Sequence, residues 1–190
     1  MKIIKLFLIA ITLFTVSASS QITKGNWMVG GNGSFSNKEI YDNNFKNNKG
    51  KTSELSINAN IGYFIIDKLQ AGVRFGYDDY KIRNVGSKDG NRYWAQYGAY
   101  TRYYFLKPAK LLNIYLDGEY FFSNNAFSNG EYNDRKDGYS FSLGPTIFFN
   151  SSVAMELGLN YSSMKTRVLS DTTENNLQFT IGFQIFLEKN

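Results

Sequence analysis

A strict alternation of apolar and polar residues over positions 53–78 constrains the fold more than any other feature of the sequence. Apolar residues occupy every second position over 55–63, and after a break at 66–68 the same pattern continues over 69–77. Side chains on a strand point alternately to opposite faces, so each run predicts a strand with one apolar and one polar face. The short break predicts that the two strands form an antiparallel hairpin.

The polar face of this hairpin carries charged residues, among them Glu54, Arg74 and Asp78. A face with these groups is not packed in a dry aliphatic core, because buried charges are costly unless they are paired. Strands of about 9–11 residues, apolar on one face and polar on the other, are typical of transmembrane β-barrels, in which the apolar face contacts lipid. The hairpin is therefore predicted to cross a membrane.

The same alternation recurs along the chain and predicts eight strands. Their apolar positions lie within residues 27–35, 55–63, 69–77, 95–105, 114–122, 139–147, 155–161 and 177–185. Long polar segments, expected to be loops, alternate with short turns and cover residues 37–51, 79–91, 123–137 and 163–175. This order predicts an all-β fold, an eight-stranded antiparallel up-and-down transmembrane β-barrel with its loops at one end and its turns at the other.

Two further features support a closed barrel in a bilayer. The apolar faces carry no charged residue, and a Lys or Arg facing lipid at the midplane would cost about 2–4 kcal/mol. An even number of strands lets the sheet close without leaving an unpaired edge in hydrocarbon. Pro145 interrupts the sixth run and cannot donate a ladder hydrogen bond, so it is expected at a bulge.

The first twenty residues are predicted to be a separate export segment. Lys2 and Lys5 precede an apolar stretch over 6–16, and small residues follow over 16–20. The apolar stretch is shorter than the about 20 residues of a membrane-spanning helix. Residues 1–20 are therefore interpreted as a cleaved secretory signal peptide, with cleavage after Ala18 or Ser20. Residues 21–190 are predicted to form one barrel domain.

Composition argues against most catalytic and nucleic-acid-binding functions. The chain has no His and no Cys, so neither a Ser-His triad nor an ordinary zinc site is available. The formal charge of +5 is spread over the sequence without a basic stripe, which does not indicate nucleic-acid binding. We expect a monomer that is not an enzyme and that uses no cofactor and no metal.

Charged residues on the predicted inner faces are the best candidates for a site. An eight-stranded barrel is just wide enough for side chains to fill it, so these charges are expected to pair with one another. Arg102 is expected to meet Asp117 across a short turn, with Arg74 near Glu119. The predicted ion-pair network, which leaves a proton or ion path as the alternative, comprises Glu54, Arg74, Arg102, Asp117, Glu119 and Glu156.

Several segments in order resemble the OmpA-like outer-membrane β-barrel family of Gram-negative bacteria. They are residues 25–31, 62–69 and 102–105, together with the aromatic last strand. The resemblance implies an outer-membrane location and a C-terminal signal within 180–187 that the barrel-assembly machinery recognises during insertion. The residues assigned to this signal are Thr180, Gly182, Ile185, Phe186 and Leu187. The chain departs from the family by continuing through residues 188–190.

Three functional interpretations remain open at this point. The preferred one is a plugged outer-membrane barrel that acts in envelope integrity or surface interaction through its exposed loops, with outer-membrane lipid and lipopolysaccharide as partners. The alternatives are a narrow channel or small-solute-binding pore, and a soluble lipocalin-like binding barrel with its apolar face inside. Cations expected to face outer-leaflet phosphates are Lys46, Lys49, Lys51, Lys81, Arg83, Lys88 and Arg92.

Overall fold

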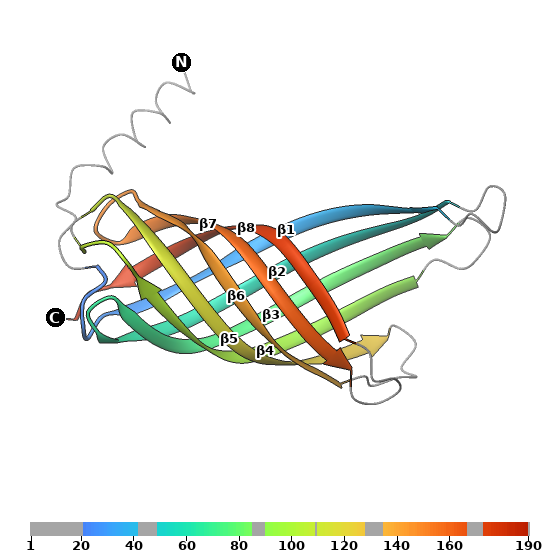
Figure 1. Cartoon of the computed structure of the whole chain (residues 1–190), viewed down its shortest axis with the longest axis horizontal. Coiled ribbons are helices and arrows are strands. Elements are labelled where there is room, and N and C mark those ends of the chain that lie inside the picture. The colour runs from blue at the N-terminus through green and yellow to red at the C-terminus, as the bar shows by residue number, and fades with distance from the viewer. Residues whose placement is uncertain are drawn as a thin grey trace, which may run out of the picture.

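Eight antiparallel strands close into a barrel in chain order, and β1 also pairs with β8 (Figure 1). The computed structural model describes residues 21–41, 49–84, 90–108, 110–127, 135–166 and 173–189. The strands are β1 (Trp27–Tyr41), β2 (Lys49–Ile66), β3 (Leu69–Asn84), β4 (Gly90–Tyr104), β5 (Leu112–Phe127), β6 (Arg135–Phe148), β7 (Val153–Thr166) and β8 (Thr173–Leu187). This confirms the predicted fold class. The predicted signal peptide lies outside the described residues.

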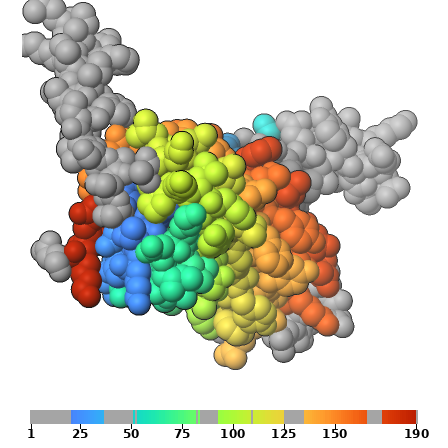
Figure 2. Space-filling model, turned by 60° about the vertical axis from the view of Figure 1, so that its left-hand side comes forward, coloured from blue at the N-terminus to red at the C-terminus, as the bar shows by residue number. Residues whose placement is uncertain are grey.

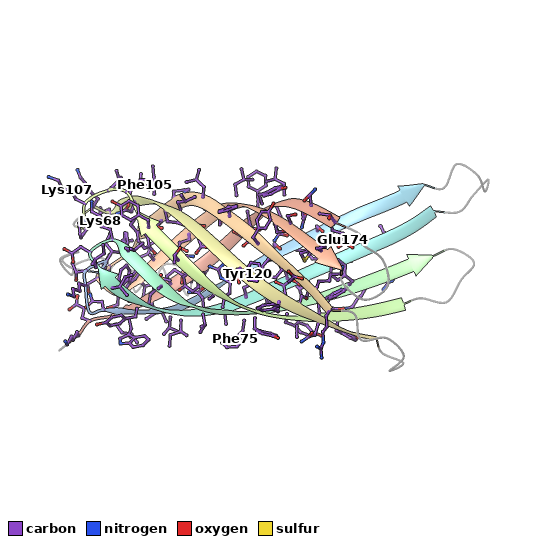
Figure 3. The ribbon with its side chains drawn as sticks, turned by 60° about the horizontal axis from the view of Figure 1, so that its bottom comes forward. Lys68, Phe75, Phe105, Lys107, Tyr120 and Glu174 are labelled. Atoms are coloured by element: carbon purple, nitrogen blue, oxygen red, sulfur yellow. The ribbon has the colours of Figure 1, made fainter. Side chains whose placement is uncertain are left out.

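The barrel is apolar outside and polar inside. Phe75 on β3 and Tyr120 on β5 project from the outer wall (Figure 3), and Phe179 on β8 is 82% exposed. Figure 2 shows the side chains of successive strands covering one side of this wall. A wall of exposed Leu, Ile, Val and aromatic side chains is stable in hydrocarbon but not in water. This polarity is the opposite of that expected for the soluble lipocalin-like alternative. Within the described residues, no helix is long and apolar enough to span a bilayer.

The strands continue into segments that the sequence assigns to loops. β1 runs to Tyr41 and β2 begins at Lys49, although residues 37–51 are predicted as a loop. The other three predicted loops are shortened in the same way, and β1–β4 project beyond β5–β8 at the loop end (Figure 1). The prediction of long loops is wrong because polar residues end the apolar alternation without ending the pairing. Backbone hydrogen bonds between neighbouring strands persist beyond the apolar belt.

Pro145 does not lie at a bulge. In the β6–β7 ladder the pairs Leu143↔Leu159 and Thr146↔Glu156 keep one register, so neither strand carries an extra residue. The ladder instead skips Gly144 and Pro145, which is consistent with the missing N–H group of proline. A Cβ at Gly144 would overlap the carbonyl oxygen of Leu157, so the two backbones approach closely there. A register shift occurs elsewhere, between Phe64 and Ile66 of β2.

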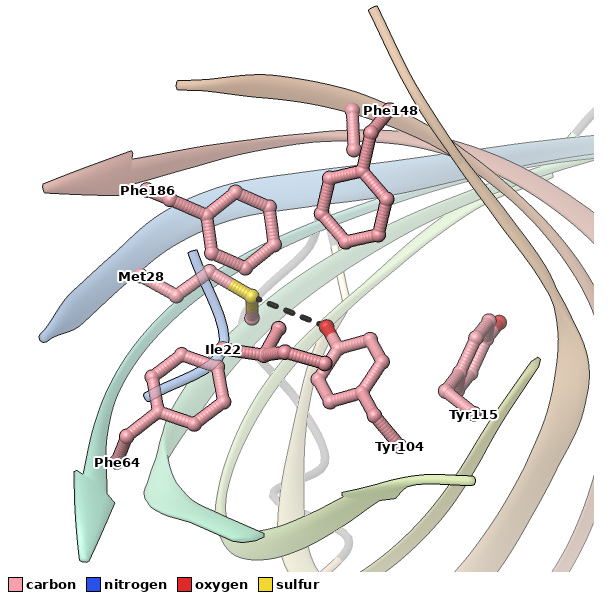
Figure 4. Packing of buried hydrophobic residues seen from close by; sticks show 8 residues of the cluster. Ile22, Met28, Phe64, Tyr104, Tyr115, Phe148 and Phe186 are labelled. Atoms are coloured by element: carbon pink, nitrogen blue, oxygen red, sulfur yellow. Dashed lines mark hydrogen bonds between the residues drawn. The ribbon is translucent and has the colours of Figure 1, made fainter. Parts of the chain in front are cut away.

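A layer of apolar side chains fills the lumen at the turn end (Figure 4). Ile22, which precedes β1, lies between Met28 and Phe64 and is fully buried. Every strand except β3 contributes to this layer. Its members are Ile22, Met28, Phe64, Tyr104, Tyr115, Phe148, Ala154 and Phe186.

Residues 21–26 are tied to the turn end by hydrogen bonds. The N–H of Lys68 in the β2–β3 turn donates to the carbonyl oxygen of Ile22 at 2.8 Å, and the N–H of Gly25 donates to the carbonyl oxygen of Phe64 at 2.9 Å. The side chain of Gln21 donates to the carbonyl oxygen of Asn150 in the β6–β7 turn. The segment before β1 is therefore built into the barrel and closes it together with the apolar layer.

Candidate functional site in the barrel lumen

Arg102 lies at the centre of a buried charge cluster above the apolar layer. Its position on β4 is directly opposite Asp117 on β5, and its Nε donates to Asp117 Oδ2 at 3.0 Å. The Nη1 group reaches across the lumen to Glu156 on β7, at 3.0 Å from Oε1 and 2.9 Å from Oε2. The Arg102 side chain is 1% exposed. One guanidinium thus joins carboxylates from two strands.

Arg74 on β3 joins the same cluster from the neighbouring strand. It binds Asp117 through two contacts, Nη1 to Oδ1 at 3.1 Å and Nη2 to Oδ2 at 2.8 Å. Its Nη1 also lies 2.6 Å from Glu119 Oε2. Bidentate contacts between guanidinium and carboxylate groups are short and directional. Asp117 therefore lies between two guanidinium groups and fixes both.

Neutral groups complete the environment of Glu156. Its carboxylate accepts hydrogen bonds from Tyr104 Oη at 3.2 Å, Thr146 Oγ1 at 3.1 Å and Gln184 Nε2 at 2.9 Å. These three residues were not among the predicted members of the ion-pair network. The only feature of the sequence that points to them is their position on the inward face of a strand. Many other residues share this position, so it does not identify a site.

Two tyrosine rings pack against the guanidinium groups. The Tyr100 ring lies 4.7 Å from the guanidinium carbon of Arg74 and 5.8 Å from that of Arg102. The Tyr115 ring lies 4.7 Å from the guanidinium carbon of Arg102. Cation–π contacts of this kind are stronger where the cation is desolvated. The two rings therefore pack beside the guanidinium groups inside the lumen.

Glu54 lies apart from the central cluster. It is opposite Tyr80 in the β2–β3 register, where Tyr80 Oη donates to its Oε1 at 2.8 Å and Ser36 Oγ donates to its Oε2 at 3.4 Å. In the described part of the chain its hydrogen-bond partners are hydroxyl groups rather than guanidinium groups. The structure therefore brings together Arg74, Arg102, Asp117, Glu119 and Glu156, with Glu54 nearer the loop end.

A polar cavity lies on the loop side of the cluster. It has a volume of about 160 Å³ and adjoins a second cavity of about 70 Å³ that reaches Glu54, Arg74 and Glu119. The lining residues of the larger cavity are Asp78, Tyr80, Trp94, Gln96, Ser123, Lys136, Met164 and Glu174. Glu174 lies near the loop end of β8 (Figure 3). The alternation pattern does not indicate this cavity, because most of its lining residues lie in segments predicted to be loops. These are Tyr80, Ser123, Lys136, Met164 and Glu174.

In the part of the chain that the structure describes, the acidic groups of the central cluster are arranged as ion-pair partners rather than as metal ligands. Within the residues that the structure describes, no group of three or more Asp or Glu side chains is arranged to hold a metal ion. The carboxylates of the central cluster are occupied by guanidinium, hydroxyl and amide donors. The charges of the central cluster are therefore engaged within the protein itself.

The residues assigned to the assembly signal lie on both faces of β8. Thr180, Gly182 and Phe186 are buried inside the barrel, whereas Ile185 and Leu187 are exposed on the outer wall. β8 is the strand that pairs with β1 to close the barrel. Recognition of this strand by the assembly machinery remains a prediction.

Comparisons with known proteins agree on the fold. A profile described as "outer membrane protein beta-barrel domain" matches residues 6–185. The crystal structure of Neisserial surface protein A aligns with a TM-score of 0.57 at 16% identity, covering 85% of this chain and 97% of that protein. The outer membrane protein OprG from Pseudomonas aeruginosa aligns with a TM-score of 0.57 at 14% identity, and the alignment covers 89% of this chain and 99% of OprG. No curated protein sequence matches the chain.

Proposed function

The chain belongs to the outer membrane protein β-barrel domain family, and on this premise we propose that it is a plugged, non-conducting and non-enzymatic barrel of a Gram-negative outer membrane. In this role it supports envelope integrity or surface interaction through the loops at one end of the barrel. The observation that carries the proposal is the filling of the lumen by two successive layers, one of ion pairs and one of apolar side chains.

The ion-pair layer argues against an aqueous path. Arg102 and Asp117 are 1% and 0% exposed at their side chains, and Glu156 is 4% exposed. A water-filled pore would leave these groups hydrated. The apolar layer below them includes Phe64 and Phe186, which stack with ring centroids 6.2 Å apart. Because the ion-pair layer and the apolar layer both fill the lumen, they support a barrel that does not conduct ions.

The outer rim supports a contact with phosphate-bearing lipid, including lipopolysaccharide. Lys51 on β2 and Arg83 on β3 are directly opposite each other, and both are exposed, as is Lys81. These cations lie on the outward face just beyond the apolar belt that includes Leu55 and Tyr77. Cations near an anionic membrane surface are attracted to it. Lys46 and Lys88, which were predicted to have the same role, lie outside the described residues, and so do the side chains of Lys49 and Arg92.

Two segments of the sequence support the proposed route to the outer membrane: the export segment 1–20 and the signal within residues 180–187 of the last strand. We expect removal of residues 1–20 during export and recognition of the last strand by the barrel-assembly machinery. Cleavage after Ala18 or Ser20 would leave Ile22, which the apolar layer needs, in the mature chain. Sequencing the N-terminus of the protein isolated from outer membranes would test this assignment, and a mature chain that begins beyond Ile22 would contradict it.

Conductance in planar lipid bilayers tests the proposed function. The purified, folded barrel is expected to insert without stepwise current. Insertion is verified separately by flotation of protein-containing vesicles and by protection of the strands from protease. Steady, defined open states from protein that passes both controls would reject the plugged barrel and favour the narrow channel.

A small-solute-binding pore remains the second candidate. The specific observation that favours it is the polar cavity on the loop side of the cluster, with a volume of about 160 Å³. Binding there does not require passage through the lumen, so it is compatible with a barrel that does not conduct.

A further inference from the structure

We propose that the loop-side cavity binds a small organic cation, such as an alkylammonium or a diamine, with Asp78 as its counter-ion. The residues of this cavity that matter for the proposal are Asp78, Trp94, Gln96, Ser123, Lys136 and Glu174. This inference goes beyond the scaffold role and does not depend on it, since a sealed lumen and an open-lumen channel would both contain the cavity.

The cavity already holds one ammonium group of the protein itself. Lys136 Nζ lies 4.1 Å from the centroid of the Trp94 ring and 3.1 Å from both carboxylate oxygens of Glu174. An aromatic face combined with a carboxylate is the arrangement by which proteins recognise ammonium ligands. The Lys136 contacts show that the walls of the cavity are chemically suited to such a group.

Asp78 supplies a further negative charge at the other side of the cavity. It is 7% exposed, and its carboxylate accepts hydrogen bonds from Ser56 Oγ and, at 2.8 Å, from Gln96 Nε2. These donors are neutral, so within the described residues the Asp78 charge is stabilised by hydrogen bonds and not by a cation. A buried carboxylate in this state gains most from a positively charged ligand.

The balance of charge along the lumen points the same way. Among the inward-facing side chains that the structure describes, carboxylates outnumber cations. The cations are Arg74, Arg102 and Lys136, and the carboxylates are Glu54, Asp78, Asp117, Glu119, Glu156 and Glu174. Among the described residues that line the cavity, two are carboxylates and one is a cation, and in low-dielectric surroundings this local balance attracts cations.

Ser123 provides an independent sign that the cavity is built for a polar occupant. Its side chain is 1% exposed and lines the cavity, yet its Oγ has no hydrogen-bond partner in the described part of the protein. Buried hydroxyl groups without partners are uncommon and are usually satisfied by a ligand or by water. An N–H group of a bound ammonium would donate to this oxygen.

The volume sets the size of the ligand. A cavity of about 150 Å³ accommodates benzene, a molecule of about six non-hydrogen atoms, and the cavity here has a volume of about 160 Å³. A diamine with a four-carbon chain matches this size. Anions are disfavoured by the buried charge of Asp78, and an apolar ligand would leave the Ser123 hydroxyl without a hydrogen-bond partner.

Trp94 provides a direct optical test. The chain has two tryptophans, and Trp27 lies on the outer wall at the turn end, so a Trp27→Phe background leaves Trp94 as the single reporter. The folded protein in zwitterionic micelles is titrated with 1,4-diaminobutane, and calorimetry is run in parallel. A saturable change in Trp94 fluorescence is expected, whereas succinate, which has the same chain length and the opposite charge, is expected to give none.

Neighbouring carboxylates on opposite faces of β3 provide a matched pair of variants. Asp78→Asn is expected to weaken binding by about tenfold or more, because a hydrogen bond to a charged group contributes at least about that factor. Asp79→Asn is the control, since Asp79 faces outward and pairs with Lys81 at 3.4 Å; its affinity is expected to stay within about twofold of the parent. Retained folding is verified for each variant by heat-dependent mobility on a gel.

Three results would overturn the proposal. The first is a titration with 1,4-diaminobutane that shows no saturation in either fluorescence or calorimetry. The second is equal affinity of the Asp78→Asn and Asp79→Asn proteins, and the third is equal binding of succinate. Should Asp78→Asn not refold, Ser123→Ala takes its place: it removes the unpartnered hydroxyl and is expected to weaken binding severalfold, and unchanged affinity would count against the site.

Discussion

Replacement of Arg102 by Met is expected to destabilise the barrel through one particular carboxylate. Arg102 contacts both Asp117 and Glu156, but Asp117 retains the two contacts with Arg74 after the change. Glu156 retains neutral donors only. The substitution therefore leaves the buried carboxylate of Glu156 without a cationic partner, whereas Asp117 keeps one.

The magnitude follows from the burial of this pair. Removing one partner of a buried ion pair costs about 3–5 kcal/mol, and the Arg102 and Glu156 side chains are 1% and 4% exposed. The hydrogen bonds from Tyr104, Thr146 and Gln184 remain and hold part of the charge. We therefore expect a loss toward the lower end, about 3 kcal/mol.

The assay compares two double variants that differ only in which carboxylate is neutralised. Urea unfolding in lipid vesicles gives the free energy, and the temperature at which the folded band disappears on an unboiled gel gives an independent measure. Arg102→Met combined with Glu156→Gln is expected to recover most of the loss, because a buried ion pair replaced by neutral groups is often close to neutral in stability. Arg102→Met combined with Asp117→Asn is expected to recover nothing and to lose more, since it also leaves Arg74 without its bidentate partner.

Two results would refute this reasoning. One is an Arg102→Met protein as stable as the parent, which would mean that the cluster contributes nothing to the folded state. The other is that adding Asp117→Asn restores as much of the lost free energy of unfolding as adding Glu156→Gln, or more. That result would mean that the contact of Arg102 with Asp117 on the neighbouring strand matters more for stability than its contact with Glu156 across the lumen.

Further predictions concern the apolar layer, a close backbone approach and the outer wall. Ile22→Ala is expected to cost about 2–4 kcal/mol because the residue is fully buried; Val29→Ala on the outer wall is the control, and equal effects in urea unfolding would mean that residues 21–26 do not close the barrel. Gly144→Ala is expected to lower the gel-shift temperature because its Cβ would overlap the Leu157 carbonyl oxygen, whereas Gly118→Ala, whose Cβ would meet the Phe141 ring at 3.5 Å, should be tolerated. Phe75→Lys is expected to cost about 2–4 kcal/mol in vesicles, with Phe75→Leu as its control; a Lys variant as stable as the Leu variant would place this position outside the hydrocarbon.

The sequence by itself determined which residues share a face of each strand. The period of two is a local property of extended backbone, so the alternation around Arg74, Arg102 and Glu156 was enough to place these residues on the polar faces. That the polar faces line the lumen was decided by the structure, in which all three side chains are buried. The pairing of Arg102 with Asp117 was also predictable, because strands joined by a short turn pair in a fixed register. The same local information did not fix the strand ends, since Tyr41 and Asn84 lie in polar segments that continue to pair beyond the apolar belt.

Contacts across the lumen were decided only by the tertiary structure. Glu156 is 54 residues from Arg102, and their meeting depends on the tilt and stagger with which eight strands close. Asp78, Trp94, Lys136 and Glu174 come from four strands and converge at one height for the same reason. Residues 21–26 show no alternation that would assign them to the barrel. Their position depends on the packing of Ile22 in the apolar layer and on hydrogen bonds to the turns, contacts that exist only once the barrel has closed.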